Sequence, residues 1–394
     1  MILHRLSAER NRLIEAIKEI GVDEYALRMV EKGLPLNVLV KDVKSPAANI
    51  LKQEAIASGM DAAVKRGVVS CSVEYTDVLL LGCRNSYLRL IKRLKVQPFG
   101  LDKLSSDLKT FINTGKRNYF IAGGKKISTD TPLVMGILNV TPDSFSDGGA
   151  YLSPSAAEKR INQMMKEGVD VIDIGGMSSR PGAEHIDSEE EILRITHALD
   201  YALSTKNIVS VDTCNYETAR AAINKGATII NDISGLTSNE MARICGDSGA
   251  AVCIMHMNGI PLNMQQNVSY KNIISEIKDF FAERIEKAVK AGIMEESIIL
   301  DLGFGFSKTT EQNYTLLKYL NEFDVFGMPL LIGVSRKSMI GNVTGRDKDE
   351  RLAGTIAANA AALLAGADIL RVHDVKQCVD TVKVINALIK AEVR

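Results

Sequence analysis

The residues that could carry chemistry in this chain stand where short apolar runs end. Asp212, Asn231 and Asp301 each close a run rich in Val, Ile and Leu. Two carboxylates and an amide suit the edge of a flat heterocycle of the amino-pyrimidinone kind. Buried ionisable groups are costly unless a partner or ligand satisfies them, so polar ends on every such run indicate a functional site.

A second group of residues suits an anion. Arg371 and His373 are two residues apart on a predicted strand, which places both side chains on one face. With Asn139 beside them, they could hold an anion or its metal ion. The segment Ser335–Ser338 follows the seventh run, in a region where α/β barrels often bind phosphate. We therefore expect a substrate that has both a heterocycle and a phosphate.

The elements that must position these residues repeat one pattern, a short apolar run followed by a helical stretch. Runs that are nearly continuous in apolar, β-branched residues are typical of parallel strands covered on both faces. Eight such units predict a (β/α)₈ TIM barrel over residues 118–394. A doubly wound open sheet is the competing fold, but no early G-x-G-x-x-G is present. The eight runs are Val134–Thr141, Val169–Gly176, Ile208–Thr213, Thr228–Ser234, Ala250–Met257, Ile298–Phe304, Pro329–Ser335 and Ile369–Val375.

Residues 1–117 have a different pattern and predict a smaller α/β domain ahead of the barrel. Strands are predicted at Leu36–Val43, Gly67–Glu74 and Asp77–Leu81, with helices between and around them. This domain has no chemical motif from which a role can be inferred. The sequence around Gly123-Gly124 predicts a hairpin that could cover the N-terminal mouth of the barrel.

Composition excludes several classes of partner. Lys+Arg and Asp+Glu both number 48, so the formal net charge is zero and nothing favours nucleic acid or an anionic membrane. The N-terminal residues lack the apolar core of a signal peptide, and no apolar run is long enough to span a bilayer. Six widely spaced cysteines form no zinc or disulfide pattern. We expect a cytoplasmic enzyme.

The ordered motifs resemble those of the dihydropteroate synthase family over the whole predicted barrel. One such motif would be weak, whereas all of them in order, each at the end of the expected strand, form a specific pattern. The matching segments are MGILNVTPDSFSDGG at Met135–Gly149, SSRPGAE at Ser178–Glu184, VDT at Val211, NDISG at Asn231, MHM at Met255, G-F-G at Gly303, SRKSMIG at Ser335 and RVHDV at Arg371.

The resemblance implies an activity and a set of roles. The enzyme would join 6-hydroxymethyl-7,8-dihydropterin diphosphate to 4-aminobenzoate, with Asp212, Asn231 and Asp301 on the pterin and Asn139 binding Mg²⁺. We also expect a homodimer and a target of sulfonamide drugs. Assigned to catalysis are Asp143, Asp147, Lys337, Arg371 and His373. Assigned to substrate binding are also Lys337, Phe145, Ser178, Ser179, Arg180, Pro181, Phe304, Phe306, Ser338, Arg371 and His373.

Two other functions remain alternatives. A methyltransferase that moves a methyl group from methyltetrahydrofolate to a corrinoid protein would share the barrel and the pterin-facing Asp and Asn. It would need no diphosphate site, so Arg371 and His373 argue against it. A pterin-binding protein without catalysis, with residues 1–117 as its interaction module, is the other alternative.

Overall fold

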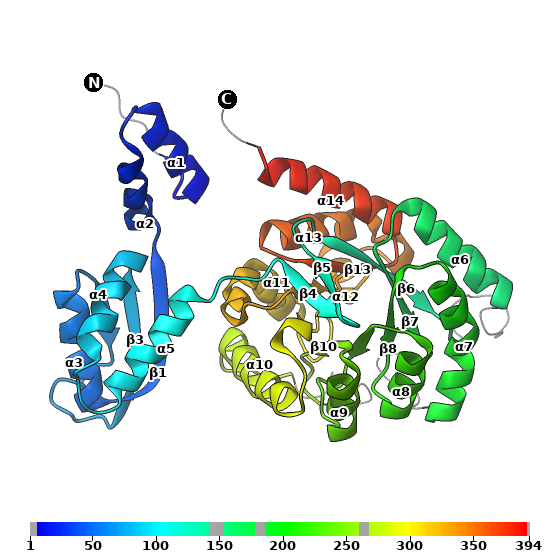
Figure 1. Ribbon diagram of the computed structural model, residues 1–394, viewed down its shortest axis with the longest axis horizontal. Coiled ribbons are helices and arrows are strands. Elements are labelled where there is room, and N and C mark those ends of the chain that lie inside the picture. Colours follow the sequence, from blue (N-terminus) through cyan, green and yellow to red (C-terminus); the bar gives the residue numbers. More distant parts are fainter. Residues whose placement is uncertain (1–5, 142–152, 178–185, 260–267, 392–394) are drawn as a thin grey trace. The chain divides into compact units, whose positions relative to one another are not determined.

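The chain forms two compact units. The computed structural model describes residues 6–141, 153–177, 186–259 and 268–391. One unit comprises residues 1–115 with 390–394, and the other comprises residues 116–389 (Figure 1). The contacts thus group Lys116 and Arg117 with the second unit, whereas the sequence placed the boundary after residue 117.

The first unit is a three-stranded antiparallel sheet, ordered β1-β3-β2, with helices on one face. The sequence was wrong about one strand, because Gly67–Glu74 forms turns and β2 lies earlier. Gly67 and Cys71 have φ values of +95° and +52°, which a strand does not adopt. The strands are β1 (Leu36–Lys44), β2 (Asp61–Val64) and β3 (Tyr75–Gly82), and the helices are α1 (Arg10–Glu19), α2 (Val30–Gly33), α3 (Ser45–Ala57), α4 (Arg84–Leu94) and α5 (Leu101–Asn113).

The second unit contains a closed barrel of eight parallel strands, as the sequence predicted. Neighbours pair in chain order, and the last strand pairs with the first through Ile369↔Leu133 and Leu370↔Val134. Because all strands are parallel, their carboxyl ends meet at one mouth. The strands are β6 (Leu133–Asn139), β7 (Val171–Gly175), β8 (Ile208–Asp212), β9 (Ile229–Asp232), β10 (Ala251–Met255), β11 (Ile298–Asp301), β12 (Leu330–Ile332) and β13 (Ile369–Val372).

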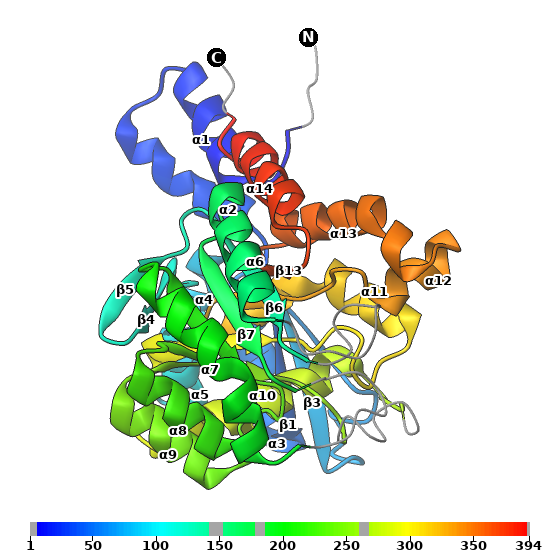
Figure 2. The same cartoon turned by 90° about the vertical axis from the view of Figure 1, so that its right-hand side faces the viewer.

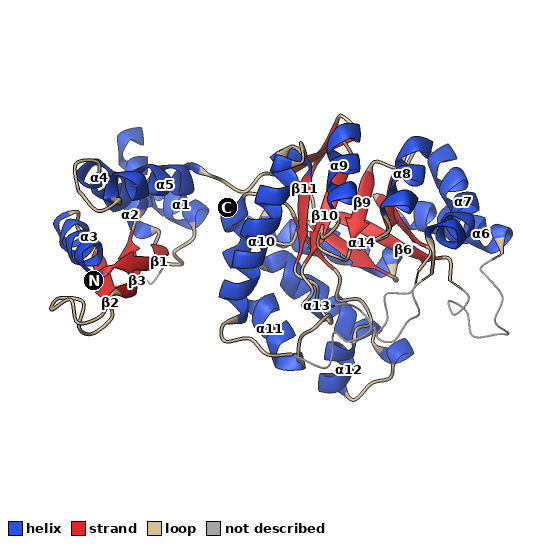
Figure 3. Ribbon diagram, turned by 90° about the horizontal axis from the view of Figure 1, so that it is seen from below, coloured by secondary structure: helices blue, strands red, loops and turns tan. Residues whose placement is uncertain are grey.

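Helices surround this barrel on the outside (Figure 3), and α6, α7 and α8 lie side by side along it (Figure 2). Several begin at a residue whose side chain accepts a backbone N–H, such as Ser153 for α6 and Asp187 for α7. Among the described residues, no helix has the length and apolar character needed to cross a membrane. The helices are α6 (Pro154–Glu167), α7 (Ser188–Ser204), α8 (Tyr216–Lys225), α9 (Asn239–Ser248), α10 (Ile273–Lys290), α11 (Thr310–Lys318), α12 (Ser338–Thr344), α13 (Leu352–Leu364) and α14 (Val375–Ile389).

A hairpin closes the N-terminal mouth of the barrel. It consists of β4 (Tyr119–Ala122) and β5 (Lys125–Ser128), as the sequence predicted. The buried side chains of Phe120 and Ala122 belong to an apolar cluster with residues of all eight barrel strands, many of them at the first positions of a strand. Because the described side chains inside this end are apolar, we expect a polar ligand at the opposite mouth.

Lys116 fastens the start of the second unit to the same end of the barrel. Its Nζ lies 2.9 Å from Asp368 Oδ2 and 3.0 Å from Asp324 Oδ1, and it donates to the carbonyl of Gly366. Asp368 also accepts from the backbone N–H of Leu330 at 2.7 Å. Burial raises the pKa of Asp368 to about 6, although Lys116 opposes that rise.

We predict that Lys116→Met destabilises the barrel by about 1–3 kcal/mol at pH 7.5, because the buried Asp368 carboxylate loses its cation. The folded-state pKa of Asp368 is raised, so the free-energy cost of its burial builds up as the pH rises from the unfolded pKa to the folded one, and a variant with a still higher folded pKa loses further stability above pH 6. The deficit should therefore shrink at pH 5.5, where Asp368 is mostly protonated. Urea unfolding at both pH values measures this, with the exposed Lys125→Met as control. An equal loss at both pH values would contradict the assignment.

Candidate active site at the C-terminal mouth of the barrel

Arg371 is the centre of the polar residues at the open mouth. Its Nε donates to Asp173 Oδ2 at 2.6 Å and its Nη2 donates to Asp212 Oδ2 at 2.6 Å. Asn231 Nδ2 also donates to Asp173 Oδ2, at 3.3 Å. The strands β13, β7, β8 and β9 thus each contribute one side chain to a connected hydrogen-bond network. Arg371 is the only cation bonded to these two carboxylates among the residues that the structure describes.

This network leaves polar atoms without partners. Asp173 Oδ1 and Asn231 Oδ1 are buried and, within the described part of the chain, have no hydrogen-bond partner. A buried acceptor of this kind costs about 1–3 kcal/mol unless a donor reaches it. Burial raises the pKa of Asp212 to about 7, an effect that Arg371 opposes and Asp173 reinforces. The site therefore offers acceptors to a ligand that carries N–H groups.

Lys337 and Asp301 form the neighbouring part of the mouth. Asp301 Oδ1 accepts from the backbone N–H of Gly303 at 2.8 Å, and the Lys337 ammonium donates to the carbonyl of Phe304. The Lys337 Nζ also lies 4.6 Å from the ring centre of Phe306. Burial lowers the pKa of Lys337 to about 8, which Asp301 opposes.

Gly333 brings Lys337 close to Arg371. A Cβ at this glycine would lie 3.8 Å from Arg371 Cβ and 3.9 Å from Lys337 Nζ. The side chain of Arg371 therefore begins, and that of Lys337 ends, beside Gly333, which directly follows β12.

His373 and Asn139 lie at the same mouth, on adjoining parts of the barrel. His373 Nδ1 is 3.0 Å from Ser335 Oγ, which also accepts the backbone N–H of His373 at 3.2 Å. Burial, together with Arg371, lowers the pKa of His373 to about 3. A Cβ at Gly175 would lie 3.5 Å from Asn139 Oδ1 and 3.7 Å from Asp212 Oδ2. The absence of a side chain at Gly175 thus leaves space between these two oxygens.

Comparisons with known proteins agree with this geometry. The family described as pterin binding enzyme matches residues 135–373. A bifunctional dihydropteroate synthase/dihydropteroate reductase of Helicobacter pylori is 38% identical over 393 residues, which cover 98% of this chain and 99% of that protein. The dihydropteroate synthase of Escherichia coli K12 is 43% identical over 272 residues, 69% of this chain and 96% of that protein. The chain belongs to the pterin-binding enzyme family.

A solved structure supports the same assignment. The Xanthomonas albilineans dihydropteroate synthase with 4-aminobenzoic acid has a TM-score of 0.66 and 38% identity, and covers 70% of this chain and 100% of that one. All three of these relatives are named as dihydropteroate synthases. The family resemblance and the barrel predicted from the sequence are therefore both confirmed.

The pterin-binding barrel brings together most of the predicted site residues that the structure describes. Asp212, Asn231, Asp301, Lys337 and Arg371 all lie at the open mouth, and so do Asn139 and His373. Two predicted residues differ from the rest in environment. The ring of Phe304 is fully buried in the core and only its carbonyl contacts Lys337, whereas Ser338 is exposed at the start of α12. Outside the described residues lie Asp143, Phe145, Asp147, Ser178, Ser179, Arg180 and Pro181.

Sequence reasoning missed two buried charges beside the site. Glu191 seemed to belong to a charged first helical turn, but it is fully buried and accepts from Thr213 Oγ1 at 2.9 Å, Asn215 Nδ2 at 2.7 Å and Thr218 Oγ1 at 2.8 Å. Lys308 gave no signal, yet it is 4% exposed. A helical apolar pattern could have indicated that Glu191 faces inward, because Ile195 four residues later is also buried.

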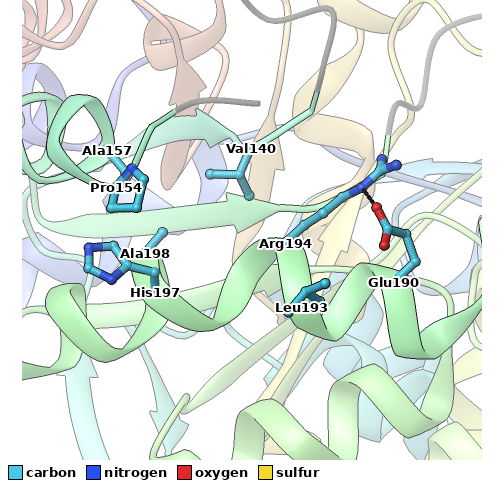
Figure 4. Close-up of a pocket in the computed structure, with 8 residues that line it drawn as sticks. All are labelled: Val140, Pro154, Ala157, Glu190, Leu193, Arg194, His197 and Ala198. Carbon is cyan, nitrogen blue, oxygen red and sulfur yellow. Dashed lines mark hydrogen bonds and ion pairs between the residues drawn. The ribbon is translucent and has the colours of Figure 1, made fainter. Parts of the chain in front are cut away.

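A hollow on the outside of the barrel contains none of these groups. It has a volume of about 250 Å³ between α6 and α7, and Figure 4 shows that Arg194 and Glu190 pair at one side of it. Its lining is mostly apolar, so we assign the chemistry to the strand ends. The lining residues are Val140, Pro154, Ala157, Glu190, Leu193, Arg194, His197 and Ala198.

We predict that Asp212→Asn weakens pterin binding. The amide replaces one carboxylate oxygen with an NH₂ donor, which must then face another donor, either Arg371 or the pterin N–H. Mismatched buried hydrogen bonds of this kind cost about 1–3 kcal/mol. Calorimetry with a free pterin measures the effect, with the exposed Asp247→Asn as control. Unchanged pterin affinity in Asp212→Asn would remove this residue from the pocket.

Proposed function

We propose that the barrel condenses 6-hydroxymethyl-7,8-dihydropterin diphosphate with 4-aminobenzoate at its open mouth. The activity of a dihydropteroate synthase, a transferase of folate biosynthesis, follows from the relatives of this chain. The observation that carries the assignment to these residues is the network around Arg371, with its unpartnered acceptors on Asp173 and Asn231. A heterocycle with several N–H donors satisfies such acceptors.

The pterin would lie over this network. Asp212, Asn231 and Asp301 would pair with its amino-pyrimidinone edge, and Lys337 would donate to its carbonyl side. Arg371 holds the Asp212 carboxylate in place, so the acceptor is oriented before the ligand arrives. The carboxylates would also stabilise positive charge as the bond from the pterin methylene carbon to the diphosphate oxygen breaks.

The leaving diphosphate would lie beside His373 and Asn139. The His373 side chain is oriented by Ser335 and its backbone N–H is occupied by the same oxygen. Asn139 Oδ1 would supply a protein oxygen to Mg²⁺, because this ion is usually held by one or two protein oxygens together with substrate phosphates. When bound, the ion would neutralise charge on the leaving diphosphate.

The second substrate would then attack. The nitrogen of 4-aminobenzoate forms a bond to the methylene carbon and releases a proton, while diphosphate departs. Phe306, Ser338 and the residues of the two strand-end loops (Asp143, Phe145, Asp147, Ser178, Ser179, Arg180 and Pro181) are the proposed contacts for this substrate. We favour Phe306 over Phe304, because the Phe306 ring is half-buried beside Lys337.

The direct test mixes the protein with the dihydropterin diphosphate, Mg²⁺ and 4-aminobenzoate and measures diphosphate release. Release that depends on both substrates supports the synthase. Release that fails to appear, with intact pterin binding, would favour the pterin-binding protein without catalysis. Methyl transfer from methyltetrahydrofolate would favour the corrinoid methyltransferase.

We predict that His373→Ala lowers kcat far more than it weakens binding of a free pterin that lacks the diphosphate. His373 contacts Ser335, in the segment after β12, so we assign it to the leaving group and not to the heterocycle. Arg371→Ala should lower kcat and also weaken the binding of the free pterin, because Arg371 orients Asp212. Steady-state kinetics and calorimetry on both variants measure the difference. A His373→Ala enzyme with normal turnover and weaker pterin binding would contradict the assignment.

A second activity is favoured by the extent of one match. The Helicobacter pylori bifunctional relative matches nearly the whole chain, whereas the match to the Escherichia coli synthase corresponds in size to the barrel unit. We propose that the first unit takes part in reducing dihydropteroate. A donor would add a hydride to the remaining C=N bond of the pterin, and water would supply the proton.

We predict that the full chain forms tetrahydropteroate from dihydropteroate with NADH, NADPH or a reduced flavin, and that a fragment of residues 115–394 does not. Both proteins should keep diphosphate release, because the fragment retains Lys116 and every assigned barrel residue. Product chromatography measures the reduction. Equal reduction by the fragment, or none by the full chain with any of the three donors, would contradict a role for the first unit.

The remaining assignments concern the protein as a whole. We propose a cytoplasmic homodimer that sulfonamides inhibit by occupying the 4-aminobenzoate position. A groove of about 730 Å³ between α11, α12 and α13 is lined by small residues, of which Ala357 and Ala361 are exposed. Small side chains allow close approach of a second helix, so this surface is our proposed dimer contact. Neither nucleic acid nor a membrane enters the proposed function.

A further inference from the structure

Lys308 is a buried lysine whose ammonium group is fully hydrogen-bonded by backbone carbonyls. Its Nζ lies 2.9 Å from the carbonyl oxygen of Gly303, 2.9 Å from that of Phe306 and 3.2 Å from that of His256. A protonated lysine has three N–H donors, and here each has one acceptor. No carboxylate forms an ion pair with Lys308 among the described residues. The side chain therefore joins the end of β10 to the loop after β11.

That loop has a backbone conformation that favours glycine, and only Ser307 adopts it at a steric cost. Gly303, Gly305 and Ser307 have φ values of +65°, +78° and +49°, so three of five residues are in the left-handed region. A Cβ at Gly303 would lie 1.9 Å from the carbonyl oxygen of His256 and 3.3 Å from Lys308 Nζ. The loop is packed so tightly against β10 that only glycine fits beside the ammonium group.

The loop also positions the groups that face the substrates. The carbonyl of Phe304 accepts from Lys337, and the ring of Phe306 lies 4.6 Å from the Lys337 Nζ. Because Lys308 holds the carbonyls on either side of Phe304, at Gly303 and Phe306, it fixes the segment that carries both contacts. Lys308 itself touches neither proposed substrate position.

We propose that Lys308 is a positioning residue for the synthase reaction, which sets the place of Phe306 and Lys337 through the loop after β11. The inference rests on the proposed function of this mouth.

Burial lowers the pKa of Lys308 to about 7, so its charge acts on Asp301 mainly below that pH. Burial raises the pKa of Asp301, and Lys337, the Gly303 N–H, Arg371 and Lys308 lower it. Cys253 on β10 also faces this carboxyl group, as a thiol whose pKa is raised well above its usual value. Removing the Lys308 cation therefore raises the pKa of Asp301. As the pH falls, Asp301 is then protonated at a higher pH than in the unmodified protein, and it no longer accepts a pterin N–H as a carboxylate.

Two variants separate position from charge. Lys308→Arg keeps the cation, but a planar guanidinium cannot direct three donors at the same three carbonyls. It should raise the KM for 4-aminobenzoate about tenfold, the equivalent of one lost hydrogen bond. It should leave unchanged the acid limb of pterin binding, that is, the pH range in which pterin affinity falls as Asp301 is protonated. Lys308→Gln removes the cation, so it should raise that KM and also shift the acid limb of pterin affinity to higher pH. Lys166→Gln, an exposed lysine on α6, is the matched control.

The readouts are KM and kcat for both substrates and calorimetric pterin affinity from pH 5 to pH 8, on full-length protein with circular dichroism as the check on folding. Variants that melt at a lower temperature but keep the wild-type KM and acid limb would overturn the proposal, because Lys308 would then be structural only. If Lys308→Gln fails to fold, a normal KM for 4-aminobenzoate in Lys308→Arg still overturns it. Absent diphosphate release in the unmodified protein would overturn the synthase assignment instead.

Discussion

A guanidinium held between two buried carboxylates is the interaction on which the open mouth of this barrel depends. Arg371 bonds Asp173 and Asp212 at 2.6 Å each and so joins β13 to β7 and β8 across the barrel interior. Moving these charges out of water costs several kcal/mol per ion, and their attraction does not always repay that cost. Such a network is therefore weak evidence for a stabilising role. It is better explained by a ligand, since acceptors on Asp173 and Asn231 are still unmatched.

The rest of the barrel unit closes the mouth opposite to this network. The β4–β5 hairpin fills the opposite mouth with Phe120 and Ala122, and Lys116 fastens the entering chain there. Ligand exchange must then occur at the carboxyl ends of the strands, where Lys308 and Glu191 hold two of the loops by buried hydrogen bonds. The chemistry is thus placed on strands, and the supporting charges are placed on the helices and loops that follow them.

The sequence predicted the barrel well because the strands are buried on both faces and their apolar runs are continuous. The polar residues at the ends of those runs, such as Asp212 and Asp301, could be recognised for the same reason. Partners could not be predicted: no pattern indicates that Arg371 bonds Asp173, since the two are far apart in the chain. Lys308 and Glu191 were missed because charged residues near a helix start are usually exposed. In the first unit, Gly67–Glu74 was wrong as a strand because local hydrogen bonds, from the N–H of Cys71 to the carbonyl of Val68 and from the N–H of Ser72 to that of Gly67, close turns there.

The most direct test of the central claim is a crystal structure of the full chain with a bound dihydropterin. The account predicts that the amino-pyrimidinone edge lies within hydrogen-bond distance of Asp212, Asn231 and Asp301, with Arg371 still paired to Asp212 and Lys337 beside the pterin carbonyl. A pterin bound elsewhere, for example in the hollow between α6 and α7, with the unpartnered oxygens of Asp173 and Asn231 left as they are, would contradict it.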